Sequence, residues 1–227
     1  GMQAAMAIMA SLIGRGTSGE GRYLDVSIAD GVVAMMSLYV DEYLVTGAEP
    51  GPGHNVLTGR YAWYGIYRCA DGGWISVGAI EPKFYANLLR ELGLDAERFG
   101  SGQYDDEVQA DLRAALTDAF ATRSRGDWAG QLGDADCCVA PVMTIPEMTD
   151  DPHVEARGLV GRAVHPAATQ SEDGELRQLD RIWAGTVRRS APESLPDASV
   201  TDTTELLTAA GWSTADIDAA IAEGAAA

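Results

Sequence analysis

One carboxylate in this sequence stands where a strand gives way to a helix. In Val77–Tyr85, Glu81 follows a short apolar stretch and precedes Pro82, a residue that favours the first position of a helix. Backbone N–H groups and the helix dipole at that point favour an ionised carboxylate. Because glutamate is not a preferred N-cap and its neighbours are apolar enough to desolvate it, we interpret Glu81 as a candidate general base. The alternative is that it merely decorates a helix start.

Two other segments have residue types suited to a ligand. Met35 and Met36 lie in a methionine-rich stretch that can adapt to varied acyl chains, although the pattern alone favours ordinary helix core. The segment 55–59, with Asn55 and Leu57, is a glycine-flanked loop that can approach a ligand closely or simply link two domains. Cys137 and Cys138 stand in an apolar stretch, and we expect them to be buried and inert.

The first fifty residues are predicted to form a helix, a strand and a second helix. Gln3–Ile13 is apolar nearly all round, which is typical of a helix buried on most sides. Tyr23–Ile28 alternates apolar and polar residues and predicts a strand. Asp30 is a plausible N-cap for a helix of about sixteen residues that Gly47 can end.

A hairpin and several helices must position Glu81. Strands are predicted at Tyr61–Arg68 and Trp74–Ala79, and the Asp-Gly pair in Ala70–Gly73 indicates a tight turn between them. A helix from Pro82 to about Leu92 follows. Further elements are predicted from amphipathic patterns and capping signals: helices at Glu107–Ala121 and Ser124–Leu132, a strand at Cys137–Met143, a short helix capped by Thr144 with Glu147, one helical turn at His153–Gly158, irregular chain with short strands over Gly161–Ser199, and a last helix capped by Ser213.

Composition excludes several classes of function. The net charge of −18 disfavours nucleic acid and anionic membranes as partners. No apolar run reaches the ~18 residues that a membrane span needs. The three cysteines contain no CxxC and the three histidines are scattered, so we predict no metal site and no disulfide framework. Unpaired cysteines fit a reducing compartment, and we expect a cytoplasmic protein.

Several motifs resemble those of the CaiB/BaiF, or family III, CoA-transferases. Gly21–Ser27 with Asp30-Gly31 resembles the strand-to-helix signature of that superfamily, and Tyr67–Gly72 with Trp74–Gly78 is similar to the hairpin of its small domain. Asp151–His153 with Ala156–Gly158, and the ending Gly211–Ile217, also resemble family hallmarks. The resemblance implies an α/β fold in which a small α+β domain accompanies part of a Rossmann-like large domain.

Within the superfamily, Gly78–Pro82 resembles the version found in α-methylacyl-CoA racemases. These enzymes remove and return the proton next to a thioester carbonyl, and the resemblance implies that Glu81 supports a histidine base while an aspartate serves the opposite face. It also implies that Tyr64 lies near the acyl group. We therefore predict Glu81 as catalytic, and a substrate-binding set that comprises Tyr64, Asn55, Leu57, Ile80, Met35 and Met36.

The resemblance also implies an organisation and partners. Residues 1–50 and 161–227 would belong to the large domain and residues 51–160 to the small one, in an interlocked homodimer. The substrate would be an acyl-CoA thioester, with coenzyme A as part of the substrate and no separate cofactor. The aspartate and histidine would lie ahead of residue 1, so we expect this chain alone to be inactive and to expose the apolar surface of Met2–Ile13. Two alternatives stay open: a CoA-transferase that works through an aspartyl anhydride, and a non-catalytic partner of a separately encoded half.

Overall fold

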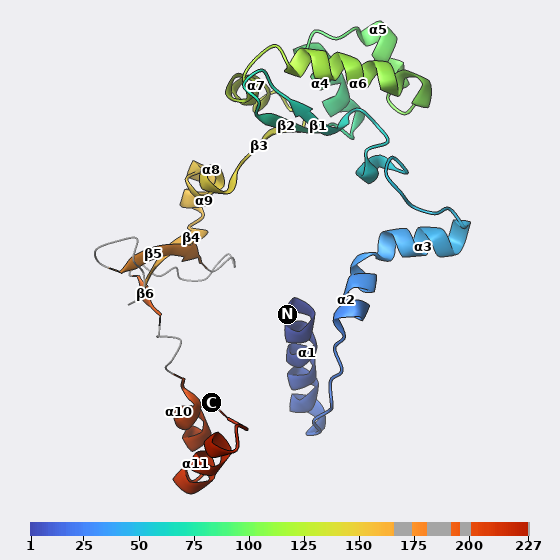
Figure 1. The fold of residues 1–227 in the computed structure, drawn as a ribbon. Coiled ribbons are helices and arrows are strands. Elements are labelled where there is room, and N and C mark those ends of the chain that lie inside the picture. The colour runs from blue at the N-terminus through green and yellow to red at the C-terminus, as the bar shows by residue number, and fades with distance from the viewer. Residues whose placement is uncertain (166–173, 181–191, 196–200, 227) are drawn as a thin grey trace. The chain divides into compact units, whose positions relative to one another are not determined.

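The computed structural model describes residues 1–165, 174–180, 192–195 and 201–226. The chain divides into two compact units, Gly1–Val142 and Met143–Ala227 (Figure 1). The structure is mixed α/β, with many helices and two small three-stranded sheets, one in each unit. The irregular chain predicted over 161–199 lies partly outside the described residues. The division at residues 50 and 160 stays a prediction.

The first unit begins with three helices, α1 (Met2–Ser18), α2 (Ile28–Met35) and α3 (Ser37–Thr46). Gly47 ends α3 in the left-handed conformation, as predicted. The long predicted helix is interrupted at Met36, and its N-cap is Ser27, which accepts a bond from the backbone N–H of Asp30, rather than Asp30 itself. The shorter hydroxyl reaches the third N–H of the helix, which moves the helix start three residues upstream.

The strand predicted at Tyr23–Ile28 is wrong. Residues 23–27 have no regular secondary structure, Ile28 already begins α2, and none of these residues pairs in either sheet of the described structure. Apolar alternation alone gives a segment two faces, but a strand also needs a neighbour for its backbone hydrogen bonds. The sequence pattern could not show whether such a neighbour exists.

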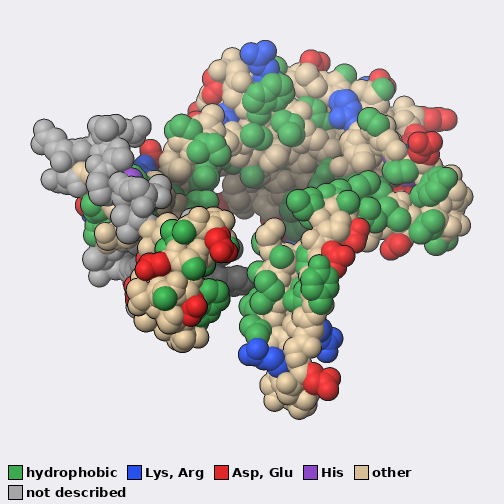
Figure 2. All heavy atoms as spheres, turned by 60° about the horizontal axis from the view of Figure 1, so that its bottom comes forward, with side chains coloured by type: hydrophobic (Ala, Val, Ile, Leu, Met, Phe, Trp, Pro, Cys, Tyr) green, Lys and Arg blue, Asp and Glu red, His purple; other side chains and the backbone are tan. Residues whose placement is uncertain are grey.

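Apolar side chains lie open on α1–α3. No residue of α1 is buried, and Met2 and Ile13 are 84% and 76% exposed. Figure 2 shows hydrophobic side chains gathered along this helical segment. The expectation that Gln3–Ile13 is buried is therefore wrong for this chain, because no described element covers the helix. The expected exposed apolar surface is confirmed.

The rest of the first unit packs helices on one face of a sheet (Figure 1). Strands β1 (Tyr64–Arg68), β2 (Trp74–Gly78) and β3 (Val139–Val142) pair antiparallel in the order β1-β2-β3. The hairpin turn is confirmed: Cys69 N–H donates to the Gly73 carbonyl (2.8 Å), and Gly72 takes φ +83°. The accompanying helical elements are η1 (Val56–Thr58), α4 (Pro82–Glu91), α5 (Ala96–Phe99), η2 (Gly100–Gly102), α6 (Asp106–Phe120) and α7 (Arg125–Leu132).

The core of this unit lies between the sheet and α4, α6 and α7. Side chains of all four meet there, and burying large apolar side chains stabilises the fold by ~1.5–3 kcal/mol each. Pro82 starts α4 and Ser124 caps α7, as predicted. The largest fully buried side chains of the core are Trp63, Tyr85, Phe120, Ile75, Leu88, Leu89, Leu112, Leu116, Leu132 and Cys137.

The second unit is smaller and more open. It contains α8 (Ile145–Thr149), α9 (Pro152–Ala156), β4 (Val160–Val164), β5 (Glu175–Leu179), β6 (Glu193–Ser194), α10 (Thr203–Ala209) and α11 (Thr214–Ala222). β4 pairs antiparallel with β5 and parallel with β6. The predicted capping box of Thr144 and Glu147 is confirmed, and Ser213 caps α11.

Candidate functional site

A groove of about 490 Å³ lies on the face of the β1-β2-β3 sheet that turns away from the helices. Side chains alternate along each strand, so Tyr67 and Val77 are buried while Tyr64, Ile66 and Ser76 face outward. An outward sheet face is usually polar, but this one carries an aromatic and an aliphatic side chain. The groove is lined by Leu57, Gly59, Tyr64, Gly65, Ile66, Ser76, Val77, Gly78 and Cys138.

Gly78 keeps the middle of the groove open. It pairs with Tyr64 across the hairpin, and its N–H donates to the Cys138 carbonyl at 2.9 Å. A Cβ at this position would stand 3.9 Å from the Tyr64 ring and 3.8 Å from the Cys138 carbonyl oxygen, which is ordinary contact. The backbone would thus accept a Cβ here, and what glycine contributes is the space that a side chain would otherwise take from the groove.

The loop 55–59 forms one wall of the groove. The Asn55 carboxamide accepts from the Leu57 N–H (3.0 Å), and Asn55 with Thr58 forms a capping box around η1. Arg113 donates to the Gly59 carbonyl at 2.9 Å and ties the end of the loop to α6. Leu57 is half exposed and lines the groove, whereas the Asn55 side chain is occupied in shaping the loop. The structure thus brings Leu57 and Tyr64 together and gives Asn55 a supporting position.

Glu81 stands at the N-cap of α4, directly after Gly78–Ile80. Its carboxylate makes no capping hydrogen bond and its side chain is exposed. The expected desolvation by apolar neighbours is therefore wrong in this chain, because Pro82 and Lys83 are exposed as well and leave the carboxylate open to water. Glu81 does not line the groove, but its charge reaches a residue that does. Burial is the main cause that raises the pKa of the Cys138 thiol, and the charges of Glu81 and Asp136 raise it further.

The two adjacent cysteines differ in exposure. Cys137 is buried, and its thiol donates to the Leu132 carbonyl at 3.5 Å, as the apolar setting predicted. Cys138 is exposed, so its predicted burial is wrong. The Cys138 backbone takes the left-handed conformation, with φ +52°, directly before β3 begins. Cys138 and Ser76 line the groove although neither was predicted to; the position of Ser76 in an alternating strand was the available signal.

The remaining predicted residues lie at different distances from the groove. Ile80 is half-buried beside Glu81, and its carbonyl accepts from the Gln103 carboxamide at 2.8 Å and the Tyr104 hydroxyl at 3.2 Å. Met35 and Met36 lie at the end of α2, 82% and 47% exposed, and neither lines the groove. In the described residues the structure does not bring these methionines to Tyr64.

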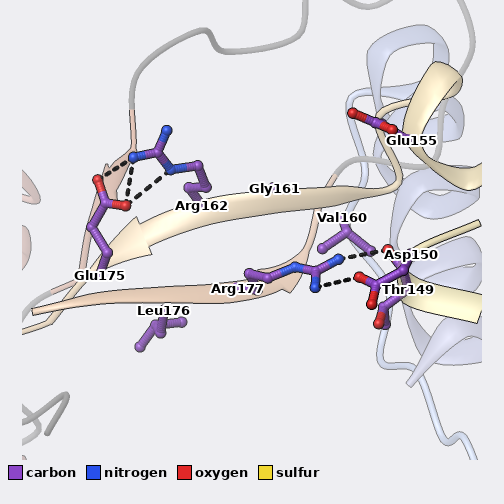
Figure 3. Close-up of a pocket in the computed structure, with 9 residues that line it drawn as sticks. All are labelled: Thr149, Asp150, Glu155, Val160, Gly161, Arg162, Glu175, Leu176 and Arg177. Atoms are coloured by element: carbon purple, nitrogen blue, oxygen red, sulfur yellow. Dashed lines mark hydrogen bonds and ion pairs between the residues drawn. The ribbon is translucent and has the colours of Figure 1, made fainter. Parts of the chain in front are cut away.

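A second hollow of about 640 Å³ lies in the second unit, beside β4 and β5 (Figure 3). Its two cations are already paired. Arg162 forms a two-pronged contact with Glu175, and Arg177 pairs with Asp150 at 2.7 Å (Figure 3). Guanidinium groups that carboxylates have neutralised do not attract an anion, so we do not assign a ligand to this hollow.

Two further observations limit the chemistry. No described helix has the length and apolar character of a membrane span. Within the described ranges, no three His, Cys, Asp or Glu side chains gather in a way that could hold a metal ion.

Comparison with known proteins identifies the family. The model of "CoA-transferase family III" matches residues 1–194. This chain belongs to CoA-transferase family III. The match covers the groove, Glu81 and the sheet of the second unit.

Relatives of this family III chain carry two kinds of activity in their names. This chain is 30% identical to alpha-methylacyl-CoA racemase of Homo sapiens, over 70% of this chain and 41% of the relative. It is 28% identical to succinyl-CoA–D-citramalate CoA-transferase of Chloroflexus aurantiacus over 68% of this chain and 39% of the relative. The family III chain therefore spans about two fifths of the length of these curated relatives.

The fold of the family III chain agrees with a solved structure. A CaiB/BaiF family protein from Brucella suis superposes with a TM-score of 0.61 at 22% identity, over 85% of this chain and 48% of that one. The predicted α/β fold class is thus confirmed.

Proposed function

We propose that this chain forms part of an enzyme that removes and returns the α-proton of a 2-methylacyl-CoA thioester. The observation that carries the proposal is the position of Glu81, an exposed carboxylate without a capping bond, three residues after Gly78, which lines the groove together with Tyr64 and Leu57. The racemase relative supports the same chemistry. Coenzyme A would enter as part of the substrate, and no other cofactor is needed.

The reaction requires three things at the α-carbon. A base takes the proton from one face, an acid returns a proton to the other face, and donors stabilise the enolate oxygen in between. Glu81 is assigned to support the base, as the racemase resemblance implies. Because this chain spans about two fifths of the length of its curated relatives, the activity is proposed for the natural polypeptide that carries it.

The groove suits the apolar end of such a substrate. Leu57, Ile66 and Tyr64 present apolar surface, and Gly78 leaves room between them. The Tyr64 hydroxyl adds one polar group to a mainly apolar wall, which is the usual composition of a small-molecule site. We assign Leu57 and Tyr64 to the acyl group, with Asn55 shaping the wall and Ile80 positioning Glu81; Met35 and Met36 remain proposed contacts from α2.

The test is hydrogen exchange at the α-carbon. The natural polypeptide is incubated with a 2-methylacyl-CoA in deuterated water, without an acceptor acid, and deuterium uptake is followed by mass spectrometry. Glu81→Gln should reduce the rate by ~10²-fold or more, the scale of a lost acid–base contribution. Glu97→Gln is the matched control, because Glu97 is an exposed glutamate at the start of α5 and does not line the groove. Equal exchange by both variants would remove Glu81 from the site.

The second candidate function is CoA transfer between carboxylic acids. The citramalate CoA-transferase relative favours it, and its aspartyl anhydride route needs no α-proton chemistry. Absence of deuterium uptake, together with CoA transfer once a second acid such as succinate is added, would establish this branch. Glu81→Gln would then leave transfer unchanged.

Partners and location follow from the exposed surface and the cysteines. We propose a homodimer, supported by the open apolar faces of α1–α3, which need a cover in water. Three free cysteines support a reducing compartment such as the cytoplasm.

A further inference from the structure

Two buried glutamines lie behind the segment that presents Glu81. Gln103 and Gln109 are 7% and 6% exposed, the two buried polar side chains of the described residues. A buried carboxamide is costly unless its donors and acceptor are all engaged. No buried side-chain polar atom in the described chain lacks a partner. The hydrogen bonds of these two side chains therefore identify the backbone segments that they fix.

Gln103 holds the backbone immediately before Glu81. Its carboxamide nitrogen donates to the Ile80 carbonyl at 2.8 Å and lies 3.3 Å from that of Ala79. The Tyr104 hydroxyl donates to the same Ile80 carbonyl at 3.2 Å. Two neighbouring side chains thus converge on one carbonyl, one residue away from the candidate carboxylate.

The same glutamine is itself held from behind. The backbone carbonyl of Gln103 accepts two hydrogen bonds: one from the Trp63 indole N–H at 2.6 Å and one from the Gln109 carboxamide nitrogen at 3.1 Å. Gln109 in turn accepts from the Ala62 N–H at 2.9 Å, and the Ala79 N–H donates to the Trp63 carbonyl at 3.0 Å. These bonds form a closed set that links the entry to β1 with the exit from β2.

Glu81 needs such support because its own side chain has none. It makes no capping bond and stands in water, so its position is set by the backbone before it and by α4 behind it. Misplacing a catalytic group by ~1 Å can cost ~10²-fold in rate. Fixing the Ile80 backbone therefore matters for the rate of a reaction at Glu81, because it limits how far the carboxylate can be displaced.

We propose that Gln103 is a positioning residue that fixes the Ile80 carbonyl and thereby sets where the Glu81 carboxylate stands relative to the groove residue Gly78. Tyr104 assists through the second bond to that carbonyl. The inference rests on the proposed function of Glu81. A purely structural role would also use these bonds, so the test must separate the two.

The test is a double-mutant cycle in the natural polypeptide, with α-deuterium uptake as the readout. Gln103→Met keeps the length of the side chain and removes its donor. We expect ~10-fold loss in the maximal rate with KM changed by less than ~2-fold, because orientation and not binding is lost. In the Glu81→Gln background the same change should cost less than ~2-fold, since the group that it positions is gone.

Other outcomes would overturn the proposal. Equal losses from Gln103→Met with and without Glu81 would show a general structural role while leaving Glu81 in the site. Full exchange in Glu81→Gln alone would instead remove the proposed function, and the positioning role with it. If Gln103→Met does not fold, by circular dichroism and melting, Tyr104→Phe decides. Tyr104 is half exposed and its ring contacts with Tyr61 and Trp63 are kept, so this variant should lose ~2–5-fold in rate only where Glu81 is present.

Discussion

The packed part of the first unit and its α1–α3 segment use the same local signals but end in opposite states. In both, a serine caps a helix: Ser27 accepts from the Asp30 N–H at 3.3 Å, and Ser124 from the Asp127 N–H at 3.1 Å. Behind Ser124, α7 buries Trp128 and Leu132, while α2 buries only Gly31. Local capping signals thus start helices in both regions, and the regions differ in whether other elements pack against those helices.

The comparison shows where the stability of this chain resides. Helices in proteins are held mainly by burial of an apolar face and only weakly by propensity and capping. The sheet with α4, α6 and α7 has such a core, and α1–α3 has an apolar surface with no described cover. We therefore expect one cooperative unfolding unit in the packed region, while α1–α3 opens at lower free energy.

The largest test replaces apolar side chains in each region. Phe120 is fully buried and its ring stacks on Tyr67 and meets Trp128, so Phe120→Ala should lower the free energy of unfolding by ~3–5 kcal/mol. Ile13→Ala in α1 should change it by less than ~0.5 kcal/mol, because Ile13 is 76% exposed. Urea denaturation of both variants measures the difference. A large loss for Ile13→Ala would mean that α1 is packed in solution.

The next test uses pH, because the packed region buries phenols. Burial raises the pKa of Tyr85 to about 12, and the Tyr85 hydroxyl donates to the Phe99 carbonyl at 2.9 Å. The folded state thus holds this proton more tightly than the unfolded chain, whose tyrosines titrate near ~10. Its stabilising contribution is full below pH ~10 and is lost as pH rises from there towards 12.

Tyr85→Phe should remove that alkaline loss at the cost of ~1 kcal/mol at neutral pH for the lost hydrogen bond. The unfolding free energy measured at several pH values from 7 to 12 gives both quantities. Tyr43→Phe in α3 is the matched control, since Tyr43 is 51% exposed and should leave the curve unchanged. Parallel curves for wild type and Tyr85→Phe would contradict the expected titration.

The sequence predicted what local interactions decide. The hairpin turn at Ala70–Gly73, the proline start of α4 and the caps at Ser124, Thr144 and Ser213 depend on residues a few positions apart, and each is found. The strand at Tyr23–Ile28 failed because pairing depends on a partner elsewhere. The long helix over 30–47 failed at Met36, where nothing in the apolar pattern indicates a break.

The same limit applies to the candidate site. The order strand, Glu81, Pro82, helix was readable, because it is local. The exposure of Glu81 and Cys138 was not, since it depends on what packs over them. The role of Gln103 could not be predicted from the sequence, because its hydrogen bonds to Ala79 and Ile80 join residues more than twenty positions apart. A glutamine in a loop does not by itself indicate such contacts.

The smallest test returns to the two serine caps. Ser124→Ala should lower the free energy of global unfolding by ~1 kcal/mol, because α7 belongs to the packed core. Ser27→Ala removes an equivalent bond, yet it should leave global unfolding within ~0.3 kcal/mol and only speed amide exchange over Ile28–Met35. Hydrogen exchange and urea denaturation of the two variants separate local from global effects. Equal global losses would show that α2 unfolds together with the core, and that the exposed apolar face of α1–α3 is covered in solution.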